Sequence, residues 1–269
     1  QLLPDLAVSG AAPANLFANY TAQSLIAGYG LAVWQALAPH LPAPVLVAGY
    51  SVGEMTACHV AGWLEPVQLL TLVQQRARAM DGCGGAQAML ATSGMAAPQL
   101  AVLLEQFQAF VAIDNGGGNV VLGAALGNLQ ALAPAAVALG ARVQWLPVHV
   151  ASHTPLLQAA QPVFLANLQG ATWQAPQCAL LSGIDAQMIS QTRQLDQLQQ
   201  SLAQQLCHTV RWGACMEALV EARVDVVLEL GPGSALARML QARQPDLPCR
   251  SLADFRSFAA ALAWLARQG

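Results

Sequence analysis

The hydrophobic pattern in the first third of the chain predicts a helix, a buried strand and two further helices. The first helix is expected at 18–39, and two prolines shortly beyond it stop the pattern. The continuous apolar run Val-Leu-Val-Ala at 45–48 is typical of a strand buried in a parallel sheet. It runs through Gly-Tyr-Ser-Val-Gly at 49–53 directly into helices expected at 54–62 and 66–80. Strand, sharp turn and helix in this order indicate a parallel α/β domain.

Residues 86–148 show a different pattern, which predicts strands and helices in the order βαββαβ. Three glycines at 116–118 separate two of the strands and favour a hairpin turn. This order predicts a ferredoxin-like subdomain inserted into the larger domain. The expected strands are 86–94, 110–115, 119–125 and 141–150, and the expected helices are 97–108 and 126–140.

After the insertion the parallel α/β pattern resumes. The sequence therefore predicts a discontinuous large domain, 1–85 and 149–269, and a small subdomain, 86–148. The expected helices lie at about 154–169, 192–207 and 211–222, from Gly233 and at the C-terminus, with strands at 178–183 and 224–230.

The composition narrows the classes of function. Hydrophobic residues make up 55% of the 269 residues and charged residues only 9%, against ~25% in a typical soluble domain, which excludes a disordered chain. A net charge of −3 without any basic run argues against binding to nucleic acid. All eleven basic residues are arginines, so Schiff-base chemistry and a P-loop lysine are excluded.

Two long stretches, 6–53 and 143–184, contain no Asp, Glu, Lys or Arg. Proline, glycine, asparagine and glutamine interrupt both, and neither offers about 20 consecutive apolar residues, so we expect no membrane span. Histidines and cysteines are scattered without the spacing of a metal or redox site. We therefore expect no metal and no cofactor, and free thiols in a cytoplasmic protein. The cysteines are Cys58, Cys83, Cys178, Cys207, Cys215 and Cys249.

Ser51 is the sharpest candidate for chemistry. It lies between Gly49 and Gly53 at the strand-to-helix turn, the geometry of the nucleophile elbow in hydrolase-like α/β domains. Side chains at the two glycines are expected to collide with the neighbouring helix and strand. The turn also places the Val52 N–H where it can donate to an oxyanion. The alternative is an ordinary helix N-cap serine.

A serine nucleophile needs a base, and five histidines compete for this role. His149 and His153 flank the strand that leaves the small subdomain, where the rim of a cleft between the domains is expected. Spacing alone does not show which of the two is the base. We expect residues 152–155 to begin a helix that holds the imidazole rigidly. Structural or solvated roles are expected for the others, His40, His59 and His208.

Five motifs occur in an order and spacing that resemble a known family. The motifs are GYSVGE at 49–54, QRARAM at 75–80, VASH at 150–153, QQLCHTVRW at 204–212 and ELGPG at 229–233. With these motifs the chain is similar to the malonyl-CoA:acyl carrier protein transacylases and to the acyltransferase domains of polyketide synthases. The resemblance covers nearly the whole chain, including the ferredoxin-like insertion.

The resemblance implies a transfer of malonyl from malonyl-CoA to the phosphopantetheine thiol of an acyl carrier protein. It implies that malonyl-CoA acylates Ser51 and that His153 is the base. Arg76 falls where the family pairs an arginine with the malonyl carboxylate, and a planar guanidinium suits that bidentate contact. The position of Gln205 implies that its backbone carbonyl orients the histidine, so that no aspartate is needed. Asn115 corresponds to a residue near the acyl pocket.

The chain departs from the family pattern in several places. The N-terminal strand and GQGxQ loop of the family, which supply a second oxyanion donor, do not occur, and we expect that an upstream segment is missing. Tyr50 replaces the usual histidine, which favours the relatives that serve malonate decarboxylase. Ser152 before the histidine resembles the discrete malonyl transacylases. Glu54 follows the elbow as in the family and is expected to be structural.

Two other functions stay open. A serine thioesterase or esterase would need an acid between Ser51 and His153 in the chain, and Asp114 is formally available. An inactive scaffold subunit would explain the missing loop. The C-terminal part of the chain carries most of the arginines and is the side expected to dock an acidic carrier protein. The candidates for that contact are Arg193, Arg211, Arg238 and Arg243.

Overall fold

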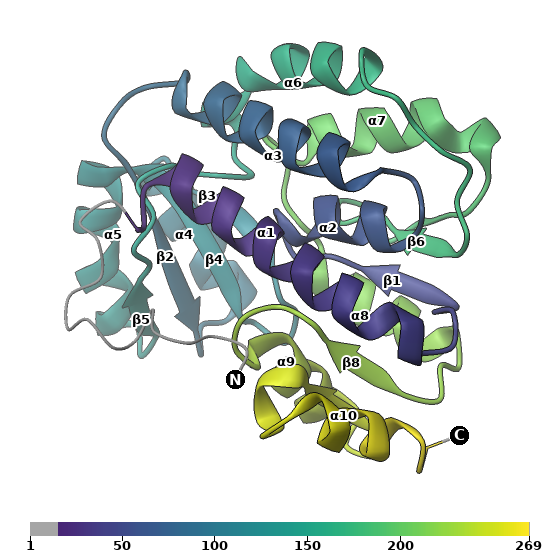
Figure 1. Cartoon of the computed structure of the whole chain (residues 1–269). Coiled ribbons are helices and arrows are strands. Elements are labelled where there is room, and N and C mark those ends of the chain that lie inside the picture. The colour runs from purple at the N-terminus through teal and green to yellow at the C-terminus, as the bar shows by residue number, and fades with distance from the viewer. Residues whose placement is uncertain (1–15, 269) are drawn as a thin grey trace.

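The computed structural model describes residues 16–268 (Figure 1). The first fifteen residues of the expected large domain lie outside the described part. Within it, the chain folds as an α/β structure with parallel strands, as the sequence predicts. The first elements are α1 (Asn19–Leu37), η1 (Ala38–His40), β1 (Leu46–Ala48), α2 (Gly53–Val60) and α3 (Pro66–Asp81).

The central sheet of the larger part has the order β1-β6-β7. β1 pairs in parallel with β6 (Ala179–Leu181), and the short β7 (Met188–Ile189) adds an antiparallel edge that the sequence pattern did not predict. Helices α2 and α3, with α6 (Ala160–Gln169) and α7 (Leu195–Gln204), cover this sheet (Figure 1). Their apolar faces pack together in one buried core, in which residues such as Met55, Leu72 and Leu202 are almost fully enclosed.

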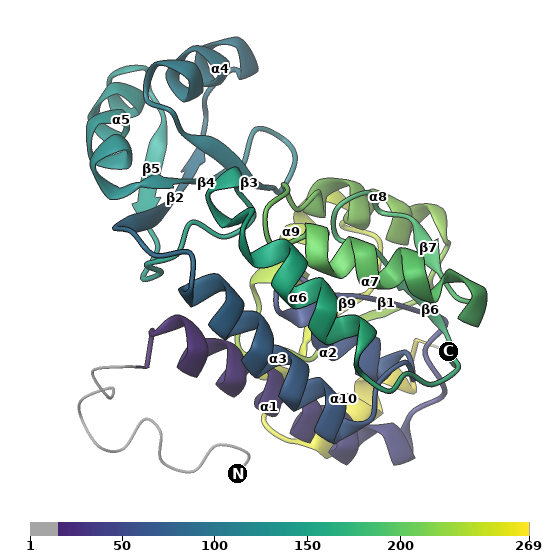
Figure 2. The same cartoon turned by 90° about the horizontal axis from the view of Figure 1, so that it is seen from above.

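The small subdomain is a four-stranded antiparallel sheet of order β3-β4-β2-β5. Figure 2 shows its two helices on the side that faces away from the larger part. This βαββαβ arrangement is the ferredoxin-like unit that the pattern predicts. Its elements are β2 (Gln87–Ser93), α4 (Ala97–Gln106), β3 (Phe110–Asp114), β4 (Val120–Ala125), α5 (Leu126–Ala138) and β5 (Arg142–Trp145).

Alternation along β2 explains how the two parts pack together. Ala88 and Leu90 face the core beneath α4 and α5, whereas Met89 and Ala91 face a second core shared with the larger part. Successive side chains of a strand point to opposite faces, so one apolar strand serves both cores. α8 (Trp212–Glu221) contributes Trp212 and other apolar residues to the second core.

The C-terminal elements pack beside the central sheet. A two-stranded parallel sheet joins β8 (Val227–Glu229), which lies within the strand expected at 224–230, to β9 (Cys249–Ser251). The sequence pattern did not predict β9. This part of the chain also contains helices α9 (Ala235–Arg243) and α10 (Phe258–Leu265). The 3-10 turn η3 (Thr192–Gln194) precedes α7, and the 3-10 turn η4 (Leu252–Asp254) follows β9.

Several expected elements are shorter than predicted: the strands expected at 178–183 and 224–230 have three residues each, and the helix expected at 192–207 is divided into η3 and α7. Prolines explain two further cases. The strand expected at 141–150 ends at Trp145, because Pro147 cannot donate to a sheet ladder. The helix expected at 154–169 is divided into a 3-10 turn, η2 (Pro155–Leu157), and α6. Pro162 lacks an N–H and its ring crowds the carbonyl four residues earlier, so one continuous helix cannot form.

Three further observations concern the described residues alone. No helix between residues 16 and 268 is long and apolar enough to cross a membrane. In the same range, no group of three or more His, Cys, Asp or Glu side chains is placed to hold a metal ion. All six cysteines are free.

Candidate active site

The turn between β1 and α2 holds Ser51 in a strained conformation. Its φ is +53°, a region that costs a non-glycine residue about 1–3 kcal/mol and is often associated with functional sites. A Cβ at Gly49 would lie 2.2 Å from the Glu54 nitrogen, so this glycine is required as expected. A Cβ at Gly53 would meet no atom within 4 Å, so the expected collision there is wrong. Gly53 is the first residue of α2, and the space beside its Cα is open.

Ser51 and His153 form a hydrogen-bonded pair. Ser51 Oγ lies 2.8 Å from His153 Nε2, and His153 Nδ1 lies 2.5 Å from the backbone oxygen of Gln205. A carbonyl oxygen only accepts, so Nδ1 carries the proton and Nε2 is free to accept the serine proton. This arrangement distinguishes the two candidate histidines, because His149 is exposed.

His153 does not begin a helix, contrary to the expectation from sequence. Its φ is +63°, which places it in a tight turn before η2. Two hydrogen bonds hold His153 in place instead. Its backbone N–H donates to the Leu206 carbonyl at 2.9 Å, and its ring Nδ1 bonds the neighbouring Gln205 carbonyl. The segment around 205–206 therefore orients both the backbone and the ring of the histidine.

Burial keeps the catalytic histidine in its neutral form. It lowers the pKa of His153 to about 3, the positive charge of Arg76 adds to this effect, and the Gln205 carbonyl opposes it. The imidazole is therefore neutral at pH 7 and able to accept a proton.

Arg76 is a buried cation in the wall of the site. Its side chain is 1% exposed and projects from α3. It donates to Gln23 Oε1 at 2.6 Å and to Gln205 Oε1 at 2.8 Å, which leaves further guanidinium N–H groups for a ligand. Burial lowers its pKa to about 10, so it stays charged at pH 7. Arg78, by contrast, is exposed and lies over the Tyr20 ring.

Gln205 connects the base, the cation and a buried acid. Its Nε2 donates to Glu54 Oε2 and, at 3.3 Å, to the Ser51 carbonyl. Glu54 is 1% exposed, accepts from the Gly183 N–H at 3.1 Å, and has a pKa raised to about 7, mainly by burial. The sequence predicted a structural role for Glu54 but not this hydrogen-bond network. The only signal was an acid directly after the elbow in a stretch otherwise free of charge.

Gln23 is a site residue that sequence analysis missed. It lies on α1, is 6% exposed, and supports Arg76 through the hydrogen bond from the guanidinium. Its amide nitrogen donates to Asn19 Oδ1 at 2.7 Å, which fixes the direction of the amide. No distinct signal for it exists in the sequence, because Gln23 is one of several uncharged polar residues on α1.

The remaining predicted residues surround the serine. Tyr50 packs edge-on against Trp212 at 5.4 Å between ring centres. Burial raises the pKa of Tyr50 to about 12, and the Asn115 side chain opposes this shift. Ser152 is buried, with its hydroxyl 3.5 Å from the Val150 carbonyl. Val52 is the N-cap of α2, and no acceptor among the described residues takes its N–H.

Asp114 has no part in the dyad. Its Oδ1 accepts from the Gly116 N–H at 2.7 Å in an exposed turn, while His153 Nδ1 is already bonded to the Gln205 carbonyl. His59, also outside the site, bonds the Leu64 carbonyl at 2.6 Å. The geometry is thus that of a Ser–His dyad without an acid.

Comparisons with known proteins give a consistent picture. Residues 24–251 match the acyl transferase domain family. A malonyl CoA-acyl carrier protein transacylase of Haemophilus influenzae is 28% identical over 84% of this chain and 73% of its own length. The polyketide synthase GfsB of Streptomyces halstedii is 32% identical over 73% of this chain, which spans 4% of that synthase.

Solved structures show the same similarity. The crystal structure of MCAT from Mycobacterium tuberculosis superposes with a TM-score of 0.85 and 29% identity, over 96% of this chain and 84% of that one. A malonyl-transacylase in complex with a type II polyketide synthase acyl-carrier protein (PlMCAT:AntF) gives a TM-score of 0.86 and 25% identity. That match covers 93% of this chain and 82% of the solved one.

Proposed function

The chain belongs to the acyl transferase domain family, and from that premise we propose that it moves a malonyl group from malonyl-CoA to the phosphopantetheine thiol of an acyl carrier protein. The observation that carries the proposal is a Ser–His dyad beside one buried arginine. Ser51 Oγ lies 2.8 Å from His153 Nε2, and Gln205 contacts both His153 and Arg76.

The first half of the reaction acylates the serine. Ser51 Oγ attacks the thioester carbonyl while His153 Nε2 takes the hydroxyl proton. The Val52 N–H donates to the oxyanion of the tetrahedral intermediate. When the intermediate collapses, the carbon–sulfur bond breaks and the imidazolium returns its proton to the CoA sulfur.

The second half reverses these roles with a different thiol. His153 takes the proton of the carrier's phosphopantetheine thiol, whose sulfur attacks the acyl-serine. The ester bond to Ser51 breaks, and the serine oxygen regains the proton from His153. A neutral imidazole is needed at the start of each half, and burial keeps His153 neutral at pH 7 by lowering its pKa to about 3.

Arg76 provides the selectivity for a dicarboxylic acyl group. An uncharged acetyl group would leave the buried guanidinium without an anionic partner, whereas the malonyl carboxylate would accept two parallel hydrogen bonds from it. Loss of a buried charge contact of this kind costs 2–5 kcal/mol, so we expect Arg76→Ala to lower acylation by malonyl-CoA about a hundredfold.

Intact-protein mass spectrometry tests the proposal. The enzyme is mixed separately with malonyl-CoA, acetyl-CoA and methylmalonyl-CoA. We expect a malonyl adduct on the wild type, no adduct on Ser51→Ala, and a shift towards acetyl on Arg76→Ala, with Arg78→Ala as the matched control. CoA release without an adduct would instead indicate a thioesterase, and neither adduct nor CoA release would indicate a scaffold subunit.

The setting of the reaction follows from the same premise. Relatives include a polyketide synthase and a transacylase bound to a polyketide carrier protein, so we propose a carrier of fatty-acid or polyketide synthesis as the acceptor. Tyr50 is the residue that favours malonate decarboxylase instead, and assays against both kinds of carrier distinguish these acceptors. The six free cysteines support the cytoplasm as the compartment.

We further propose that the chain needs no metal or prosthetic group of its own. Ser51, His153, Val52 and Arg76 supply a nucleophile, a base, an oxyanion donor and a carboxylate partner, and the phosphopantetheine arrives on the carrier protein. Activity that survives exhaustive dialysis against a chelator would support this, and activity restored only by an added metal would contradict it.

A further inference from the structure

Gln87 connects the two segments that join the small subdomain to the larger part. It is the first residue of β2, and its side-chain amide forms one hydrogen bond to each segment. Its Nε2 donates to the Gly84 carbonyl at 2.8 Å, in the segment between α3 and β2. Its Oε1 accepts from the Ala151 N–H at 2.8 Å, in the segment between β5 and η2. The two bonds fix both polar atoms of the amide and bring together segments that lie far apart in the sequence.

Ala151 lies two residues before the catalytic histidine, in a compact turn. It is completely buried, so water cannot replace Gln87 as the acceptor for its N–H. The Ala151 carbonyl accepts from Thr154 Oγ1 at 2.7 Å, which closes the turn around His153. The φ of His153 is +63°, a conformation that persists only where the surrounding structure holds it. A shift of Ala151 would therefore displace the imidazole that bonds Ser51.

A second strand of the small subdomain presses on the same turn. Gly123 lies in β4, and a Cβ there would be 2.8 Å from Thr154 Cγ2 and 3.3 Å from Ala151 Cβ. A side chain at this position would force the buried Thr154 to shift. β2 and β4 thus contact the turn from the small subdomain, and the Leu206 carbonyl of the larger part bonds the His153 N–H.

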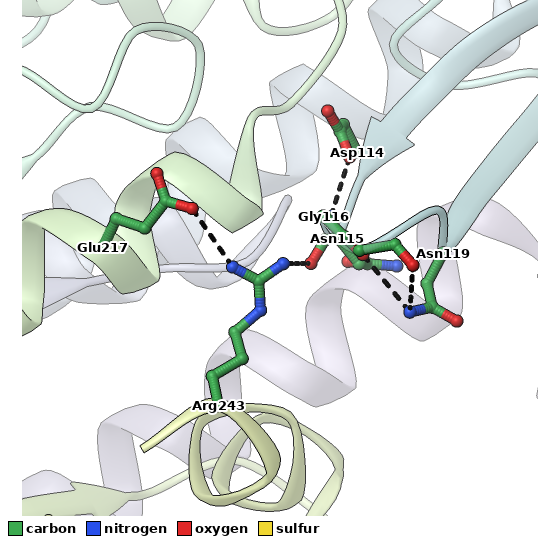
Figure 3. Close-up of polar contacts among 7 residues, drawn as sticks. Asp114, Asn115, Gly116, Asn119, Glu217 and Arg243 are labelled. Carbon is green, nitrogen blue, oxygen red and sulfur yellow. Dashed lines mark hydrogen bonds and ion pairs between the residues drawn. The ribbon is translucent and has the colours of Figure 1, made fainter. Parts of the chain in front are cut away.

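The opposite end of the small sheet is attached by a different residue (Figure 3). There the Arg243 guanidinium donates to the Asn115 backbone oxygen at 2.9 Å and to Glu217 Oε1 at 3.3 Å. Asn115 lies in the hairpin that leads into β4, whereas Gln87 pairs with the last residue of β4. Arg243 and Gln87 therefore attach the sheet at its two ends, and Gln87 is at the end where the His153 turn lies.

We propose that Gln87 is a positioning residue for the catalytic histidine. By holding the Ala151 N–H, it keeps His153 Nε2 within hydrogen-bonding distance of Ser51 Oγ. The inference rests on the proposed function, because its effect is read in the acylation of Ser51. It gives the small subdomain a part in the chemistry, although the serine and the histidine both belong to the larger part.

Two substitutions at Gln87 separate its two hydrogen bonds. Gln87→Met keeps a similar length and loses both bonds, whereas Gln87→Glu keeps an acceptor for the Ala151 N–H and loses the donor to Gly84. A displacement of about 1 Å at the reacting groups costs about a hundredfold in rate, and we expect Gln87→Met to lower kcat for acylation by malonyl-CoA about tenfold. Gln87→Glu should retain most of the rate, because the bond to the turn remains.

The Michaelis constant distinguishes positioning from a general loosening of the site. Arg76, the expected partner of the malonyl carboxylate, projects from α3 and lies outside the turn, so KM should not change in Gln87→Met. A loosened site would raise KM as well. Gln144→Met on the neighbouring β5 removes an exposed amide by the same substitution and should leave kcat and KM unchanged. Urea unfolding of each variant shows that the full chain is folded in the assay.

A serine-reactive fluorophosphonate tests the same dyad without a malonyl group. His153 takes the Ser51 proton in this labelling too, while fluoride leaves, so we expect Gln87→Met to slow labelling by the same factor as acylation. Unchanged acylation in Gln87→Met, a loss of acylation without a loss of labelling, or equal losses in Gln87→Met and Gln87→Glu would overturn the inference. A wild type that the fluorophosphonate labels but malonyl-CoA does not acylate would instead overturn the proposed function.

Discussion

Arg76 donates a hydrogen bond of 2.8 Å to the side-chain oxygen of Gln205, although 129 positions separate the two residues. The backbone oxygen of the same Gln205 lies 2.5 Å from His153 Nδ1. One residue therefore supports the group expected to select the acyl chain through its side chain, and the base through its backbone. This division makes the two functions separable by mutation.

Gln205→Ala should impair selectivity more than chemistry. The substitution keeps the carbonyl that orients His153 but removes the amide that contacts Arg76, Glu54 and, at 3.3 Å, the Ser51 carbonyl. We expect the ratio of kcat/KM for malonyl-CoA over acetyl-CoA to fall about tenfold or more, because a buried cation loses one of its fixed partners. The ratio is measured by single-turnover acylation with each thioester.

The exposed Gln200 on the same helix provides the control, since Gln200→Ala removes an amide outside the network. If Gln205→Ala lowered both rates equally, the side chain would be needed for the base as well, and the division of roles would be wrong.

The acylation rate should not follow an ordinary histidine titration. Burial and the Arg76 charge lower the pKa of His153 to about 3, so the imidazole stays neutral through the mildly acidic range. We expect kcat/KM for malonyl-CoA to show no histidine-like fall between about pH 8 and pH 5. A fall with a midpoint near 6.5 would show that the imidazole titrates as if solvated.

Glu54 and His153 should give opposite dependences of stability on pH. Burial raises the pKa of Glu54 from 4.5 to about 7, so the folded state holds this proton more tightly. Its contribution is full below about pH 4.5 and is lost as pH rises through 7. The lowered pKa of His153 acts oppositely, and its contribution grows as pH rises from about 3 to 6.5.

The variant Glu54→Gln isolates the contribution of His153 to the pH dependence of the free energy of unfolding. We expect the free energy of unfolding of this variant to rise more steeply with pH between 4.5 and 6.5 than that of the wild type, and His153→Gln to show the reverse. Urea unfolding at a series of pH values measures both slopes. Parallel curves for the wild type and Glu54→Gln would mean that Glu54 has the same pKa in the folded and unfolded states.

Local patterns were enough to predict most of the fold. The run at 45–48 with its turn predicted the elbow, and the alternating residues of β2 serve two cores, as their period of two suggests. The family motifs singled out Ser51, His153 and Arg76, and the structure brings these three side chains to one place. Prolines at 147 and 162 shortened two elements, because a single absent N–H outweighs the surrounding pattern.

The supporting contacts were beyond the reach of the sequence. Glu54 and Gln205 are 151 positions apart, and Arg76 and Gln23 are 53 apart. Each of these side chains is an ordinary glutamine, glutamate or arginine, and only the packing of α1, α2, α3 and the end of α7 makes them neighbours. Contacts across such separations depend on tertiary structure, which periodicity does not encode.

The two glycines of the elbow should respond very differently to a methyl group. At Gly49 the added Cβ would lie 2.2 Å from the Glu54 backbone nitrogen, and backbone cannot move aside as a flexible side chain can. We expect Gly49→Ala to lower the free energy of unfolding by about 3 kcal/mol or more and to abolish acylation, because the strain falls on the turn that carries Ser51. At Gly53 the Cβ would reach open space on the first turn of α2, so Gly53→Ala should be neutral or stabilise by up to about 1 kcal/mol. Urea unfolding and the mass of the malonyl adduct test both variants, and similar losses at the two positions would show that the elbow depends on chain flexibility rather than on this one close approach.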